Sequence, residues 1–355
     1  MQWLGGECKL EAESRITGLA AIAGKGDTRR LRLLAVLGAA AALLGLVSLA
    51  IGPVHLLPGD VLGALFGHGS AIDTAIVVEL RLPRTLLALI VGAMLSLGGA
   101  AMQGYLRNPL AEPSVLGVSN GAALGAVVAL YFGLANGFLA ALPLCAIMGA
   151  LCALVPLLVL AGRSESPLGL ILAGMAIGTL AGAGIALALN LSANPFAAME
   201  IMTWLMGSLE DRSFAHLCLA MPCIVIGGAL LLWDARALDA LALGEEGAQA
   251  LGVSLRQVRL RLLLGLAIGV GGAVAVSGAI GFVGLIVPHL VRPLTDRRPS
   301  AVLFPSALAG AALLCAADML VRIVPTATEL RLGVVTAFLG VPVFIHHLMR
   351  LRRLW

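Results

Sequence analysis

The stretch that decides the fold is residues 262–291, LLLGLAIGVGGAVAVSGAIGFVGLIVPHLV. It is apolar throughout, and a basic segment flanks it on each side, residues 256–261 before it and 292–298 after it. Because Lys and Arg favour the cytoplasmic side of a membrane, a segment with two basic flanks must cross the bilayer and return. One full crossing needs about 20 residues, so one leg must be short or broken. We expect the break among Gly278, Gly281, Gly284 and Pro288.

The composition of the whole chain is that of a polytopic membrane protein. Of its 355 residues 60% are hydrophobic and only 12% are charged, whereas soluble domains carry about 25% charged residues. Both ends of the chain are basic, which predicts two cytoplasmic termini and an even number of crossings. The hairpin counts as two spans, and eight further uncharged apolar blocks lie at about 33–52, 85–105, 114–134, 138–162, 168–190, 214–233, 301–317 and 332–349. We therefore predict an all-α protein with ten transmembrane helices.

The distribution of basic residues agrees with this topology. Ten spans place 18 of the 23 Lys and Arg residues on the cytoplasmic side. Residues 1–32 form a cytoplasmic tail with no apolar core typical of a signal peptide, residues 33–350 form one ten-span domain, and residues 351–355 form a second cytoplasmic tail. Five arginines fall on the opposite side and need an explanation of their own: Arg81, Arg84, Arg212, Arg322 and Arg331.

The sequence contains no motif of a catalytic or nucleotide-binding site. The nearest candidate for a phosphate loop, AGKGDT at 23–28, lacks the required glycine spacing and the Ser or Thr after Lys. The six cysteines lie mostly inside apolar runs without metal-ligand spacing, so we expect small buried side chains, no metal and no disulfide. We predict a transport protein without a cofactor, without enzymatic activity of its own and without a nucleic-acid partner.

Glycines recur at helical spacing in several of the predicted spans. Gly174, Gly178 and Gly182 lie on one face of the fifth span, and similar stripes occur in the third and seventh. Such stripes allow helix backbones to pack closely in lipid, which is the interpretation we favour. The alternative for the fifth span is a smooth face that lines a wide pathway. Asp318 lies within the ninth span, and its i+4 spacing to Arg322 predicts an ion pair.

One compact polar segment, residues 234–261, interrupts the apolar character of the chain on the cytoplasmic side. Its sequence is DARALDALALGEEGAQALGVSLRQVRLR. Gly244 and Gly252 delimit a short helix, and Ser254 with Gln257 fits a capping box that starts the next helix. Small side chains in the short helix suit insertion into a groove of another protein, and Glu245 and Glu246 suit basic partners. An ordinary interfacial helix explains the pattern equally well.

Several long motifs make the chain resemble a known family. Residues 81–126, RLPRTLLALIVGAMLSLGGAAMQGYLRNPLAEPSVLGVSNGAALGA, are similar to the signature of the FecCD-type permeases of ABC importers for ferric siderophores, haem and cobalamin. Further matches are WLMGSL (204–209), LGEEGAQALGVS (243–254), SGAIGFVGLIVPHLVR (277–292) and ELRLGVVTAFLGVPVF (329–344). The resemblance covers nearly everything after residue 33.

The resemblance implies partners and roles for particular residues. It implies a homodimer in the bacterial inner membrane, two cytoplasmic ATPase subunits, and a periplasmic binding protein that delivers the solute. Glu245, Glu246, Ala248 and Gly252 would then contact the ATPase, whose motion switches the fifth and tenth spans between outward and inward openings. The residues that would dock acidic groups of the binding protein are Arg81, Arg84 and Arg322.

The substrate expected from the resemblance is a large iron chelate. A ferric siderophore is our first expectation, haem or cobalamin is the alternative on the same scaffold, and a stand-alone secondary transporter is the competing class. The family often has Glu-Leu-Pro-x-Gly where this chain has ELRLG at 329–333. The additional Arg331 would favour an anionic chelate or extend the docking surface.

Overall fold

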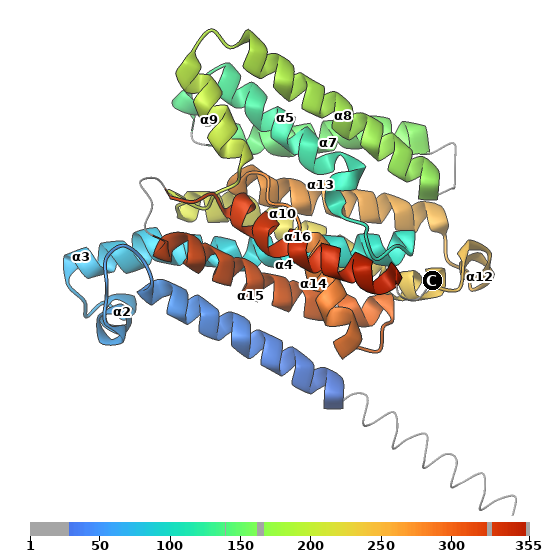
Figure 1. Cartoon of the computed structure of the whole chain (residues 1–355), viewed down its shortest axis with the longest axis horizontal. Coiled ribbons are helices and arrows are strands. Elements are labelled where there is room, and N and C mark those ends of the chain that lie inside the picture. Colours follow the sequence, from blue (N-terminus) through green and yellow to red (C-terminus); the bar gives the residue numbers. More distant parts are fainter. Residues whose placement is uncertain (1–27, 139, 162–166, 325–328, 353–355) are drawn as a thin grey trace, which may run out of the picture.

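The computed structural model describes residues 28–138, 140–161, 167–324 and 329–352. Within these residues the chain is helical, and ten apolar helices form one bundle (Figure 1). Seven are long enough to cross a membrane and three are shorter, which confirms the predicted fold class. Residues 1–27 and 353–355 of the predicted tails lie outside the described part. The ten helices are Thr28–Ala50, α4 (Leu82–Leu106), α5 (Val118–Tyr131), α7 (Ala141–Ala161), α8 (Pro167–Leu191), α10 (Phe214–Trp233), α13 (Leu255–Ser277), α14 (Val283–Val291), α15 (Pro299–Ile323) and α16 (Leu332–Arg352).

The predicted broken hairpin consists of the full-length helix α13 and the short helix α14. The break spans Gly278 to Phe282, and both of these residues have a positive φ of 69°. Gly284 and Pro288, which we expected to mark the break, instead lie inside α14. Proline removes only one helical N–H donor, so a short helix can contain it. Gly284 is needed for packing, because its backbone lies against Gly99 of α4.

Three irregular segments satisfy each other's backbone groups at the break. Ser208 N donates to Ser277 O at 2.8 Å, Leu332 N donates to Gly207 O at 2.9 Å, and Gly333 N donates to Met206 O at 3.1 Å. Unpaired backbone groups are costly in lipid, so non-helical chain is tolerated there only when it is paired in this way. A side chain at Gly207, Gly278 or Gly333 would meet a neighbouring carbonyl oxygen, so the three motifs that contain these glycines pack directly against one another.

Helix α4 is the centre of the bundle. It is buried along most of its length and contacts α10, α13, α14 and α15. Glycines permit these close approaches: Gly92 of α4 lies against Gly310 of α15, and Gly125 of α5 lies against Gly149 of α7. Gly227 of α10 packs in the same way on α13. Backbone contact of this kind is how helices associate in lipid, so the packing interpretation of the glycine stripes holds for these pairs.

The helices define two opposite ends of the bundle, here called the α3 end and the α12 end (Figure 1). At the α3 end lie α2 (Pro58–Leu65) and α3 (Ala71–Thr74), and a π-helical turn, η1 (Ala75–Arg81), connects α3 to α4. The 11-residue helix α9 (Pro195–Leu205), which we did not predict, precedes the loop to α10. At the α12 end lie α11 (Ala235–Leu241) and α12 (Glu245–Ala250).

Candidate functional site

The α3 end contains a buried carboxylate that binds two arginines. Asp318 in α15 accepts from Arg84 Nε at 2.9 Å, and its second oxygen lies 3.0 Å from Arg322 Nη2. The exposed fraction of the Asp318 side chain is 1%. The Asp318–Arg322 pair confirms the i+4 prediction, whereas no sequence pattern indicated the bond to Arg84. Two cations around one buried anion make this carboxylate costly to remove.

Glu329 extends this group of charges toward solvent. Arg84 Nη1 donates to Glu329 Oε1 at 2.9 Å. The other carboxylate oxygen of Glu329 is buried without a hydrogen-bond partner in the described structure. Glu329 is therefore held more weakly than Asp318, although both bind the same guanidinium group.

Arg81 and Arg322 close the end of the first span. The last carbonyls of an α-helix have no partner within the helix and attract cations. Here two arginines from other helices satisfy them, and both arginines are buried. Arg81 donates to the carbonyls of Leu49, Ala50 and Val54 at 2.5–2.9 Å, and Arg322 donates to those of Ser48 and Ile51 at 2.9 Å. The two side chains thereby fasten the first span to α4 and α15.

This arrangement gives the three arginines partners within the chain. We treated Arg81, Arg84 and Arg322 as outward charges that needed acidic partners on another protein. In the structure all three have partners within the chain, carbonyls at a helix end and two carboxylates. Apart from the predicted Asp318–Arg322 pair, sequence reasoning missed these partners because they lie far away along the chain, up to 274 residues in the case of Ser48 and Arg322.

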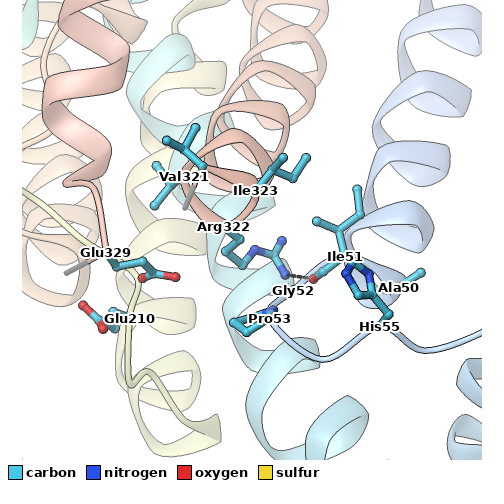
Figure 2. A pocket seen from close by; sticks show the side chains of 11 residues that line it. Ala50, Ile51, Gly52, Pro53, His55, Glu210, Val321, Arg322, Ile323 and Glu329 are labelled. Carbon is cyan, nitrogen blue, oxygen red and sulfur yellow. Dashed lines mark hydrogen bonds between the residues drawn. The ribbon is translucent and has the colours of Figure 1, made fainter. Parts of the chain in front are cut away.

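Two adjoining cavities open beside these charges, with volumes of about 580 and 310 Å³. They share the turn at Gly52 and Pro53 and the side chains of Glu210, Arg322 and Glu329. Figure 2 shows Arg322 pointing toward Ile51, and Glu210 and Glu329 also line the larger cavity. The α3 end is therefore hollowed, and its walls carry both signs of charge.

The two remaining arginines of this end also have acidic neighbours. Arg331 Nη1 lies 2.9 Å from Glu210 Oε2, so an intrachain pair accounts for the charge that distinguishes this chain from the usual ELPxG pattern. Burial lowers the pKa of Arg212 in the loop before α10, and the charges of Asp211 and Glu210 oppose that shift.

At the α12 end, α12 forms a short helix between two turns that require positive φ. Gly244 has φ 102° and Gly252 has φ 82°, so both predicted boundaries of this helix are confirmed. The surface of this segment, here called the α12 surface, consists of exposed Leu243, Glu246, Leu251 and Gly252. The two leucines are 73% and 65% exposed, which is unusual for a polar segment.

The structure shows the surroundings of Ala248 and contradicts the predicted capping box at Ser254. Ala248, which we expect at the contact with a partner, is completely buried and packs α12 on the bundle. Other residues of this short helix, such as Glu246, form its outer face. Ser254 begins α13, but its side chain makes no capping hydrogen bond, so the predicted capping box does not form. Glu245 is half-buried, and Gly252 has open space around its Cα.

The three glycines of α8 have different surroundings. Gly174 lies against the backbone of Val115 and Leu116, and Gly178 lies against Gly117 and Asn120. Both are buried inside the subunit, so close packing explains them. Gly182 is exposed, and a Cβ atom at this position would meet no other atom within 4 Å. Among the three, Gly182 alone retains the open face that a pathway position requires.

No cluster of three or more potential metal ligands occurs within the described residues. The five described cysteines are free, and Cys8 lies outside this part of the chain. Cys315 is buried as expected, whereas Cys152 of α7 and Cys218 of α10 are exposed on the single subunit. An apolar membrane environment permits a small thiol on such a face.

Comparisons with known proteins identify the architecture. Residues 40–350 match the model of the FecCD transport family. The vitamin B12 import system permease protein BtuC of Vibrio cholerae is 41% identical over 307 residues, covering 85% of this chain and 91% of that protein. BtuC of Salmonella paratyphi A is 42% identical over 333 residues, covering 92% and 97%. YvrB of Bacillus subtilis, named an uncharacterized ABC transporter permease, is 41% identical over 300 residues, covering 82% and 83%.

A solved structure agrees with these relatives. A putative metal-chelate type ABC transporter in an inward-facing conformation superposes with a TM-score of 0.79 at 31% identity, covering 90% of this chain and 99% of that one. At this coverage the shared architecture extends over nearly the whole chain. The chain therefore belongs to the FecCD transport family and is a multi-pass permease subunit of an ABC importer.

Proposed function

We propose that this permease imports a cobalamin-type metal chelate across the bacterial inner membrane. The observation that carries the proposal is the similarity to two vitamin B12 permeases over nearly the whole of both chains. Our first expectation, a ferric siderophore, has no such support among these relatives. The broader class, a large metal chelate, is also supported by the similar solved structure.

In this proposal the α12 end faces the cytoplasm and the α3 end faces the periplasm. The basic residues support this orientation, because most of the Lys and Arg residues that the structure describes lie at or near the α12 end. Two copies of the chain form the pathway, and two separate ATPase subunits drive alternating access through the α12 surfaces. Both termini are then cytoplasmic.

The α12 surface offers apolar contacts with a negative neighbour. Leu243 and Leu251 suit an apolar groove on the ATPase, and Glu246 suits a basic residue at its rim. Ala248 transmits force from this contact, because it is buried in a helix that packs against α11 and α13. Gly252 provides the turn into α13.

At the α3 end we propose that the periplasmic binding protein docks around Arg84. Arg81 and Arg322 would support this site by fixing the end of the first span. An acidic side chain of the binding protein would compete with Glu329, which is the weaker of the two carboxylates on Arg84. Arg81 and Arg322 then matter for docking by keeping the first span in place.

Uptake by reconstituted transporter tests the proposal. The permease, its ATPase and its binding protein are placed in proteoliposomes, and uptake of radiolabelled cobalamin, haem and a ferric siderophore is compared. We expect ATP-dependent uptake of cobalamin, and loss of uptake when the ATPase is catalytically inactive. ATP-dependent uptake of only an iron chelate would reject the cobalamin assignment, and uptake driven by an ion gradient alone would reject the importer mechanism.

A further inference from the structure

Polar side chains gather in the segment that leads into α5 and in the first turn of α5, and their distance from the ends of the bundle can be estimated. Pro113 begins η2 (Pro113–Leu116), and its ring lies near Gly98 of α4. At a helical rise of 1.5 Å per residue, Gly98 is about 12 Å from the α12-end terminus of α4. Asn120 Nδ2 donates to Gly178 O at 3.2 Å, and Gly178 is about 16 Å from the start of α8 by the same rise.

These depths fall near the middle of a hydrocarbon layer that is about 30 Å thick. The segment after α4 therefore enters the membrane again, as irregular chain and the short 3-10 helix η2, before α5 begins. Glu112 and Ser114 lie in this segment, and Ser119 and Asn120 follow in the first turn of α5. Ser114 and Asn120 are exposed on the surface of the single subunit, and Glu112 and Ser119 are half-buried.

Glu112 links this polar group to the broken hairpin. Glu112 Oε1 accepts from the backbone N–H of Phe282 at 2.9 Å, at the residue that precedes α14. The carboxylate therefore satisfies one of the free donors at the start of this short helix. Both segments line a cavity of about 90 Å³ together with Ser114, Ser119 and Asn120.

Lipid is an unfavourable neighbour for this face. The exposed Ser114 hydroxyl and Asn120 amide and the half-buried Glu112 carboxylate would lose hydration against lipid at mid-depth. Ionisable residues inside membranes face water-filled cavities or the interior of a bundle. A dry contact with a second copy would bury the Glu112 carboxylate further, and among the described residues no cation compensates its charge. The cavity has room for about three waters at about 30 Å³ each.

We infer that Glu112, Ser114, Ser119 and Asn120 line the water-filled transport route and contact the polar surface of the passing solute. The inference rests on the proposed transport function. The ligand class is a large solute with hydrogen-bond donors and acceptors on its rim, because the face offers hydroxyl, amide and carboxylate groups. These residues differ from the α8 glycines that the sequence suggested, and they place the pathway beside the break in the hairpin.

Labelling of introduced cysteines tests this inference without requiring transport. The six native cysteines are replaced by alanine, and Ser114→Cys, Asn120→Cys or Leu43→Cys is added to the full chain in proteoliposomes. Leu43 is the matched control, since it is 61% exposed on the first span and lies about 16 Å from Arg32 by helical rise. The reagent is a charged, membrane-impermeant methanethiosulfonate.

We expect Ser114→Cys and Asn120→Cys to be labelled to completion, and Leu43→Cys to be labelled only after denaturation in SDS. Labelling of both test positions only in SDS would overturn the inference, and so would an oxidant-induced disulfide between two copies at Asn120→Cys without labelling. Each variant must elute as a folded species in size-exclusion chromatography to be counted.

A second measurement tests contact with the solute. With ATPase and loaded binding protein present, passage of cobalamin is expected to slow the labelling of Asn120→Cys. Unchanged labelling during measured uptake would overturn the solute contact. If labelling from water succeeds but cobalamin is not taken up, the substrate assignment fails while the water-filled route stands.

Discussion

The two ends of the bundle are held together by different physical means. At the α3 end, Asp318 and the arginines around it connect helices that are far apart in sequence through buried charge. At the α12 end, α12 is shaped by local turns at Gly244 and Gly252 and exposes large leucines. Burial costs each charge of the α3 end its hydration free energy, and only its ion-pair partners offset that cost. The charged groups are therefore held in one arrangement. Beside α12 an ion pair joins Asp234 and Arg261 at 2.7 Å, whereas α12 itself is positioned by its turns and by packing on α11 and α13. Its exposed face suits a contact surface for a moving partner.

The largest effect is expected from removing the central charge of the α3 end. Asp318→Asn leaves Arg84 and Arg322 buried without their shared carboxylate. Breaking a buried pair in this way costs about 3–5 kcal/mol, so we expect a strongly lowered unfolding temperature in detergent. Thermal unfolding followed by size-exclusion chromatography measures it.

Glu329→Gln is the matched control for this variant. Glu329 is on the same guanidinium, but its side chain is 17% exposed, so the expected cost is no more than about 1 kcal/mol. Equal losses in the two variants would contradict the view that Asp318 dominates the charge network.

A smaller effect is expected at the α12 surface, on partner binding rather than on folding. Leu243→Asp combined with Leu251→Asp places two charges in the proposed apolar contact. We expect capture of the ATPase to weaken by about tenfold or more, equivalent to about 1.4 kcal/mol, with the unfolding temperature unchanged. Leu57→Asp is the control, because Leu57 is similarly exposed, at 72%, but precedes α2 at the opposite end. Normal ATPase capture by the double variant would remove this surface from the coupling model.

The smallest difference concerns two helix starts, one from each end. Asn194 at the start of α9 accepts a hydrogen bond from Phe196 N at 3.0 Å, so Asn194→Ala is expected to cost about 1 kcal/mol. Ser254 at the start of α13 makes no such bond, and Ser254→Ala is expected to change the unfolding free energy by less than about 0.5 kcal/mol. Denaturant unfolding of both variants measures the contrast. A larger loss of unfolding free energy for Ser254→Ala than for Asn194→Ala would support the capping box that the sequence suggested.

Local features were predictable because they depend on neighbours along the chain. The Asp318–Arg322 pair follows from i+4 spacing, and the boundaries of α12 follow from glycine conformations. The burial of Ala248 was not predictable, because the direction of a one-turn helix depends on the elements beneath it. The depth of Glu112 in the membrane was not predictable either. A surface loop and a segment that re-enters the membrane can have the same polar composition.

The sequence by itself determined the number of spans, the broken hairpin and the family, because hydrophobic length, basic flanks and long motifs are properties of the chain alone. Only the tertiary structure decided which charges are partners and which faces are open. Arg81 and Arg322 find helix-end carbonyls, and Glu112 finds the N–H of Phe282, across long stretches of chain. Such contacts depend on how the helices pack, and in lipid that packing follows from close backbone approach at small residues.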